Sequence, residues 1–298
     1  MPTERRLGLA FLVTVVLAWA LTWPVNKLVL AHVPPVWSVA LRSVIGTITL
    51  FAIALATRRL VAPVRGDVPV LFSVTLLHMV GFTVLTSLGL QVVPAGRSVV
   101  LAYTTPLWVT PASALFLGER LTARRLAGVA VGLGGLAILF NPVAFDWTSR
   151  ATVLGNAAIL AGAFLWAGSI LHIRGHRWHV STFELLPWQM LLATVLLVVI
   201  ALLAEGVPQI AWTPSLVALL LYGGGPGTAL AYWASANAGR RLPAFTMSLG
   251  LLATPVVSVI IATVWLGEAV TRSLVLAIAL ILGGVALGTR AEAPRRTW

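Results

Sequence analysis

The stretch TPLWVTPASALFLGE, Thr105–Glu119, returns 149 residues further along the chain as TPVVSVIIATVWLGE, Thr254–Glu268. The same offset relates three further pairs, which are Thr122 with Thr271, Gly134 with Gly283 and Gly135 with Gly284. Self-similarity at one fixed offset is the signature of an internal repeat. The chain is therefore predicted to consist of two related halves.

The composition of the 298-residue chain is that of an integral membrane protein. Apolar residues make up 59% and charged residues only 9%, and the mean hydropathy is +0.99. A water-facing surface needs about 25% charged residues, so a soluble enzyme and a disordered chain are both excluded. The net charge of +12 does not indicate nucleic-acid binding, because the basic residues fall between long apolar runs.

Apolar windows predict an all-α protein with ten transmembrane helices, since about 20 residues cross the hydrocarbon core. The first run lacks a small-residue cleavage site and is expected to remain as a span. The expected bounds are 7–30, 35–57, 68–91, 95–117, 123–140, 151–173, 182–204, 214–238, 243–266 and 272–289.

Basic residues are shared unevenly between the two sides of this topology. Fifteen arginines fall at the termini and in the connections on the same side, against three in the other connections, Arg97, Arg150 and Arg272. Lys27 and Arg42 fall inside spans. Cytoplasmic loops retain positive charge, so both termini are predicted to be cytoplasmic.

The repeat and the topology together predict an inverted arrangement. Residues 1–141 and 142–298 would each contribute five spans to one transmembrane domain, and an odd number makes the second half enter from the opposite side. Secondary transporters use inverted repeats, because exchanging the conformations of two similar halves opens a midplane site to each side in turn. Gene duplication also builds proteins that transport nothing, and we rank that alternative below transport.

Landmark residues of the first two spans and of the repeat follow the pattern of a known family. Trp19 is followed by Lys27 in the first span, Pro35–Arg42 opens the second, and each half carries a segment from proline to Leu-Gly-Glu. With these landmarks the chain resembles the EamA-type branch of the drug/metabolite transporter superfamily. One departure is Trp19–Thr22, which reads Trp-Ala-Leu-Thr where the family usually has Trp-Gly-Ser-Asn.

Within that family, three features are most similar to the YddG-type exporters of aromatic and other neutral amino acids. They are His78–Phe82, Tyr103 and Trp166, beside a tryptophan-rich first span. The resemblance implies a ten-span exporter of small metabolites in the bacterial inner membrane. The direction of transport rests on this resemblance alone.

Polar and aromatic residues near the middle of the spans are the candidates for a substrate site, because transporter sites lie near the bilayer midplane. His78 could bind substrate or carry a proton, or it could be a neutral imidazole bonded to a carbonyl. The aromatic residues could flank an aromatic substrate or serve as ordinary packing. The expected substrate-binding residues are Trp19, Trp23, Asn26, His78, Phe82, Tyr103, Trp166 and Ser169.

Glycine and proline predict hinges or broken helices in three spans. The run Gly223–Gly227 reads GGGPG, and relative to Ala in a helix Gly costs roughly 1 kcal/mol and Pro roughly 3 kcal/mol. Irregular backbone is tolerated at this depth where it lines a wet cavity or is buried in protein, so a binding site and close helix packing both remain open. The expected positions are Pro106, Gly224, Pro226, Gly227 and Pro255.

Arg42 lies about two turns inside the second span, where a charge is expensive. Its planar guanidinium could pair with a substrate carboxylate. It could equally be a structural arginine that bonds carbonyls at a helix end near the external surface.

Acidic and thiol groups are missing from the places where other mechanisms would need them. None of the eight acidic residues is expected near mid-depth, and the chain has no Cys. A carboxylate proton relay and a dedicated organic-cation pump are therefore disfavoured, and a neutral or zwitterionic solute fits better. No cofactor and no metal are expected, and a polytopic membrane enzyme would have no evident catalyst.

The sequence thus predicts an alternating-access exporter of aromatic and other neutral amino acids, facilitative and present as a monomer or weak homodimer in the bilayer. The alternative is an exporter of other small metabolites or drugs of the same superfamily.

Overall fold

The computed structural model describes residues 2–141 and 145–289, and all the secondary structure in these two ranges is helical. Helices lie at the place of every predicted span, and seven helical stretches are long and apolar enough to cross a membrane. The prediction of an all-α membrane protein is confirmed. The inversion of the halves and the side of the termini stay predictions, and Arg290, Arg295 and Arg296 lie outside the described residues.

The first half contains five helical stretches, some of them broken. The first stretch is α1 (Pro2–Val29) and the second is α2 (Pro35–Ala56). The third consists of η1 (Arg65–Asp67), α3 (Val68–Ser73), η2 (Val74–Phe82) and α4 (Thr83–Val92). The fourth consists of α5 (Ala95–Ala102) and α6 (Thr105–Leu117), and the fifth is α7 (Ala123–Leu139).

The second half follows the same plan. The sixth stretch is α8 (Arg150–Gly175) and the seventh is α9 (Thr182–Glu205). The eighth consists of α10 (Pro214–Gly224), η3 (Gly225–Leu230) and α11 (Ala231–Gly239). The ninth consists of α12 (Ala244–Leu251) and α13 (Ala253–Leu266), and the tenth is α14 (Arg272–Thr289).

The fourth and ninth stretches are broken at equivalent places. Pro106 is the second residue of α6 and Pro255 the third residue of α13, each directly after the break. A proline removes a backbone donor and clashes with the carbonyl four residues earlier, so the preceding helix ends. Both α6 and α13 then end at a left-handed glycine, Gly118 with φ 66° and Gly267 with φ 70°. The backbone therefore repeats where the sequence repeats.

The third and eighth stretches each contain a π-helical segment, η2 and η3. In the eighth stretch the run Gly223–Gly227 stays helical, but the helix changes from α to π at Gly225. The Thr228 hydroxyl donates a hydrogen bond of 2.7 Å to the Gly223 carbonyl. The sequence pattern predicts an irregularity there, but nothing in the composition of η2 predicts a second one. π-helical turns often occur at functional sites because they redirect side chains.

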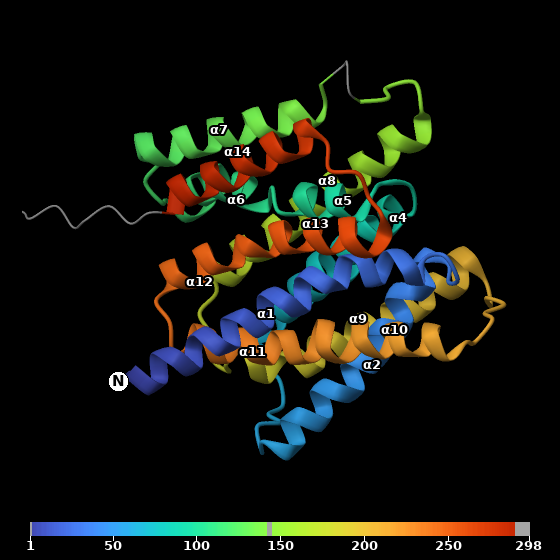
Figure 1. Cartoon of the computed structure of the whole chain (residues 1–298). Helices are drawn as coiled ribbons and strands as arrows, with labels where there is room; N and C mark the ends of the chain where they lie inside the picture. The colour runs from blue at the N-terminus through green and yellow to red at the C-terminus, as the bar shows by residue number, and fades with distance from the viewer. Residues whose placement is uncertain (1, 142–144, 290–298) are drawn as a thin grey trace, which may run out of the picture.

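Figure 1 shows α7 and α14 side by side along one flank of the helical bundle. Glycine makes this close approach possible, since a Cβ atom at Gly128 would lie 2.5 Å from the carbonyl oxygen of Gly284. Small residues commonly bring transmembrane helices together in this way.

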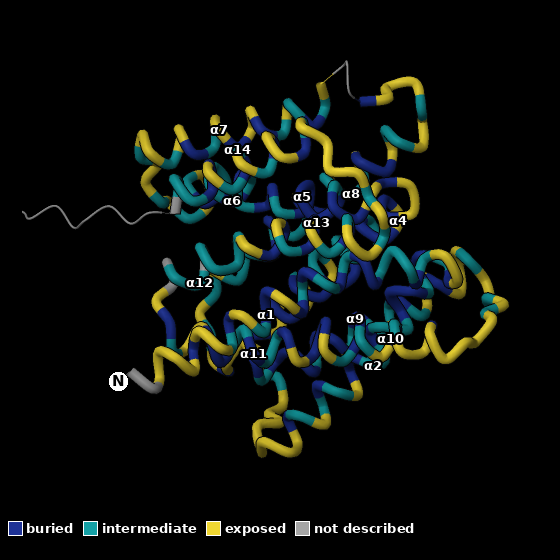
Figure 2. Tube along the Cα trace, viewed as in Figure 1, coloured by how far each residue is buried: buried dark blue, intermediate teal, exposed yellow. Residues whose placement is uncertain are grey.

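Buried residues follow the middle of the bundle, whereas its outward faces are exposed (Figure 2). These faces carry large apolar side chains, and Leu115, Leu203 and Val264 are each more than 80% exposed. Such a surface suits contact with lipid rather than with water.

Candidate substrate cavity

Side chains from both halves surround a cavity of about 140 Å³. The first half contributes α1, α2, η2, α4 and Tyr103, which follows α5, and the second contributes α8, α9, η3 and α11. Both π-helical segments therefore form part of the wall. A single water needs about 10–15 Å³ of such space, so the cavity has room for a small organic solute.

One wall of the cavity is aromatic and joins the third, fourth and sixth stretches. The His78 imidazole stacks on the Trp166 indole, with ring centroids 5.3 Å apart and planes 7° apart. The Phe82 ring lies 5.0 Å from Trp166, and the Tyr103 ring meets it edge-on at 6.1 Å. Flat rings in this arrangement present an apolar surface that suits another ring.

Most of the residues predicted to bind substrate lie on this cavity. Those lining it are Trp19, Trp23, Asn26, His78, Phe82, Tyr103 and Trp166, together with Arg42 and Gly227. The structure does not bring Ser169 to the wall: it is fully buried, and its hydroxyl has no partner among the described residues. Also away from the wall are Pro106, Gly224, Pro226 and Pro255.

Several lining residues are not among the predicted ones. Hydroxyl groups line α4 at helical spacing, from Thr83, Thr86 and Ser87, and this spacing is visible in the sequence as one face of a helix. Tyr232 lies 6.0 Å from the Trp19 ring and 6.4 Å from the His78 ring. No sequence signal finds Tyr232, because its direction depends on the π-helical turn just before it. The remaining unpredicted wall residues are Thr22, Ser38, Val39, Ser43, Met79, Leu90, Met190 and Thr228.

Arg42 brings a positive charge to the cavity. Its side chain packs against Gly223, where a Cβ atom would lie 3.2 Å from the Arg42 Cδ. No acidic residue of the described ranges lines the cavity, and Arg42 forms no ion pair or hydrogen bond with a described side chain or carbonyl. A guanidinium in this position is left for a ligand or water to satisfy.

Lys27, in contrast, is satisfied by the protein. Its ammonium donates hydrogen bonds to the carbonyls of Leu90, Gln91 and Val93 at the end of α4. A cation at a helix C-terminus stabilises the free carbonyls there. Lys27 therefore ties α1 to α4 and leaves the cavity charge to Arg42.

Carboxylates connect the two halves at one end of the bundle. Glu268, after α13, accepts hydrogen bonds from the backbone N–H groups of Ala95 (2.6 Å) and Gly96 (2.8 Å) at the start of α5. Glu205, at the end of α9, accepts in the same way from Val36 and Trp37 at the start of α2, both at 3.0 Å. Each carboxylate thus caps a helix of the other half.

The repeat equivalent of Glu268 has different partners. Glu119 bonds Arg125 at 3.1 Å and pairs with Arg174 at 3.4 Å, and it also accepts from the Ser113 hydroxyl. The two carboxylates hold equivalent places in the chain, yet one caps a helix and the other binds arginines.

Comparison with known proteins agrees with a transport function. The model of the EamA-like transporter family matches the chain twice, over residues 6–141 and 153–290. The chain is 28% identical to a probable terminal-alkyne amino-acid exporter of Streptantibioticus cattleyicolor, over 96% of this chain and 94% of that one. It is 29% identical to a probable amino-acid metabolite efflux pump of Salmonella typhimurium, over 97% and 96%.

A solved crystal structure shares the fold, with a TM-score of 0.67 and 26% identity over 95% of this chain and 97% of that chain. The names of the relatives are those of transporters and not of enzymes. Because the family model covers both halves of the chain, this protein belongs to the EamA-like transporter family.

Proposed function

We propose that the protein exports aromatic and other neutral amino acids across the bacterial inner membrane by alternating access. The observation that carries this proposal is the cavity itself, in which an aromatic wall faces the same space as a guanidinium that has no partner among the described residues. Two relatives bear amino-acid exporter or efflux names, which favours the same substrate class.

The cavity offers a different surface to each part of an amino acid. The Arg42 guanidinium can take the carboxylate through two parallel hydrogen bonds. The rings of Trp19, Phe82 and Trp166 can hold an apolar or aromatic side chain. Hydroxyl groups of Thr22 and Ser87 and the amide of Asn26 remain for the ammonium group, which meets no acid in the described wall.

Transport is facilitative in this proposal. Proton coupling through a carboxylate would need an Asp or Glu on the substrate path, and the described wall has none. The His78 imidazole stacks on Trp166 and lies 5.6 Å from the Phe82 ring, and in this proposal it serves as part of the aromatic surface.

Alternating access rests on the two halves being inverted, with both termini cytoplasmic. In an inverted pair, the contact that Glu268 makes with α5 at one end has an equivalent between Glu119 and α12 at the other. Glu268 makes its contact in this structure, while Glu119 is engaged by Arg125 and Arg174. If Glu268 released α5 while Glu119 left its arginines and bound α12, one end of the cavity would open as the other closed.

Flux of labelled Phe, Trp, Thr and Ala into proteoliposomes tests the proposal, with and without a pH gradient and against empty liposomes. Saturable flux that depends on the protein and does not change with the gradient is expected. Flux that requires the gradient would contradict the facilitative mechanism. No flux of any of the four would overturn the amino-acid substrate and favour other small metabolites of the superfamily.

A further inference from the structure

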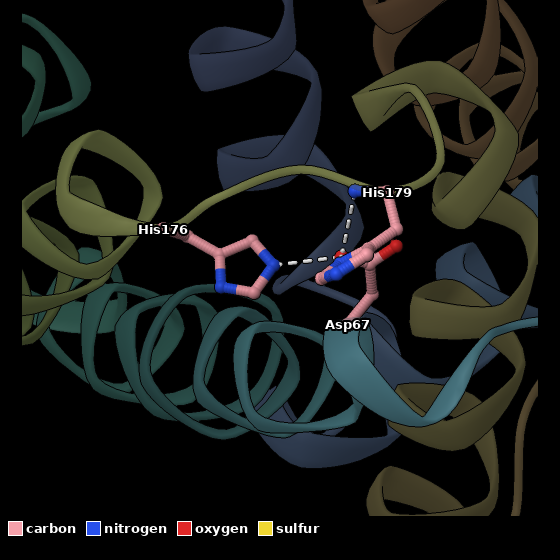
Figure 3. Close-up of side chains that lie close together, drawn as sticks. All are labelled: Asp67, His176 and His179. Carbon is pink, nitrogen blue, oxygen red and sulfur yellow. Dashed lines mark hydrogen bonds and ion pairs between the residues drawn. The ribbon is translucent and has the colours of Figure 1, made fainter.

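Three donor side chains meet away from the cavity, where the connection before α3 touches the connection after α8 (Figure 3). Asp67 lies at the end of η1, and His176 and His179 follow α8. The Asp67 Oδ1 atom is 2.7 Å from His176 Nε2 and 3.1 Å from His179 Nδ1. The donor atoms of all three residues lie within 4.8 Å of one another.

The backbone fixes the direction of the Asp67 carboxylate, which is fully buried. Its Oδ2 atom accepts a hydrogen bond of 2.9 Å from the Val180 N–H, and its Oδ1 atom accepts one of 3.2 Å from the His179 N–H. Oδ1 is thereby turned toward both imidazoles. Such outer hydrogen bonds are what orient a carboxylate that binds a metal ion.

His179 is also held in place, but on the open side of the cluster. Its ring lies directly against Gly66, where any Cβ atom would collide with the ring. The side chain is 56% exposed, whereas that of His176 is 10% exposed. Solvent therefore reaches the cluster past His179, which gives an ion an entry path and leaves room for a water ligand.

The donor set has the chemistry of a transition-metal site. Two imidazole nitrogens and one carboxylate oxygen are common ligands of Zn²⁺, with bonds of about 2.0–2.2 Å. A tetrahedral ion with such bonds places its ligand atoms about 3.3 Å apart. The observed separations of 2.7 Å and 3.1 Å would have to widen by about 0.6 Å and 0.2 Å to match this value, and the two imidazole nitrogens lie within 4.8 Å of each other.

Hydrogen bonding alone leaves Oδ1 crowded. Two imidazole nitrogens and one backbone N–H all face this single oxygen, while Oδ2 receives one N–H. Each imidazole would have to carry a hydrogen on the nitrogen that faces the carboxylate. A cation would instead bind the lone pairs of the same nitrogens, with each neutral imidazole in its opposite tautomer.

We propose that Asp67, His176 and His179 bind a divalent transition-metal ion of the Zn²⁺ type, with water as the fourth ligand. Asp67 comes from the first half and the histidines from the second, so a bound ion joins the two halves outside the cavity. The proposal does not depend on the transported substrate.

Metal binding to the purified full chain in detergent tests the site, after stripping with EDTA. Zn²⁺ titration by calorimetry should give one ion per chain, and Co²⁺ should give the visible absorption of a tetrahedral complex. His176→Ala and His179→Ala should each weaken binding at least tenfold. His32→Ala is the matched control, because His32 is exposed and lies in a different loop.

The melting temperature provides a second measurement, since an ion that binds only the folded state raises it. Zn²⁺ should raise the melting temperature of the wild type and of His32→Ala, but not that of His179→Ala, whose exposed side chain can be removed without opening the core. No binding to the wild type, or equal binding to His179→Ala, would overturn the proposal. The cluster would then be a hydrogen-bonded link only.

Discussion

Arg42 places a guanidinium on the cavity wall that no described carboxylate neutralises. The hydropathy of the second span is sufficient to predict that a charge lies inside the membrane, but it leaves open whether the group faces the bundle or reaches the surface. The structure decides this point, because the side chain packs on Gly223 in the eighth stretch. That contact joins residues from the two halves, and local spacing carries no information about it.

Arg42→Gln should raise the KM for phenylalanine by roughly 10–100-fold, because a charge-assisted hydrogen bond is worth about 1.5–3 kcal/mol. Initial rates in proteoliposomes measure the change. Arg42→Lys should restore part of the affinity, and Arg59→Gln, at an exposed position, should behave as wild type. A wild-type KM in Arg42→Gln would show that the carboxylate binds elsewhere.

Trp166→Ala should weaken transport of aromatic substrates more than that of alanine, because the indole lines the cavity as part of the aromatic wall that it forms with His78 and Phe82. An aromatic pair is worth about 0.5–1.5 kcal/mol beyond the area it buries, so a KM increase of roughly tenfold for tryptophan is expected. Competition between labelled tryptophan and alanine measures the difference. The exposed Trp147 provides the control substitution, and equal losses for both substrates would place the ring outside the substrate site.

At the scale of elements, hydropathy and the repeat predict every helical stretch, since burial in lipid requires long apolar helices. They do not predict η2, because a π-helical turn depends on contacts with other helices and not on local composition. Ser169 shows the same limit: three residues after Trp166 it is close to the same helix face, yet it packs into the core. Ser169 and Trp166 point about 60° apart around the helix, and this difference is enough to place one side chain between helices and the other on the cavity wall.

Glycine at the contact between α7 and α14 gives a prediction for stability. Gly128→Val should lower the free energy of unfolding by roughly 1–3 kcal/mol, because its side chain would meet the backbone of Gly284 and Gly288. Gly134→Val, on the same helix, is the matched control, since no atom of the described residues lies within 4 Å of its Cβ position. Melting temperatures in detergent compare the two, and an equal effect would mean that helix propensity rather than packing governs this pair.

The cap that Glu268 places on α5 gives a prediction about the opening of the cavity at that end of the bundle. Glu268→Gln should weaken this cap, because an amide offers one acceptor oxygen in place of two charged ones. The chain has no Cys, so Ser87→Cys on the cavity wall provides a single label site. Labelling with a membrane-impermeant maleimide from the Glu268 side should become several-fold faster, and in Glu119→Gln it should not. An unchanged rate in Glu268→Gln would separate the cap from gating.

For the whole molecule, the odd number of spans and the distribution of arginine predict that the two halves are inverted, and a pair of equivalent positions tests this prediction directly. Leu121 and Val270 are separated by the repeat offset, follow the two Leu-Gly-Glu turns, and are 39% and 46% exposed. In cysteine-free background, Leu121→Cys should react with an impermeant maleimide only from the cytoplasmic side and Val270→Cys only from the external side. Labelling in oriented membrane vesicles, before and after permeabilisation, measures this. Reaction of both from one side would make the halves parallel, and the exchange between Glu268 and Glu119 could then not open the cavity to opposite sides.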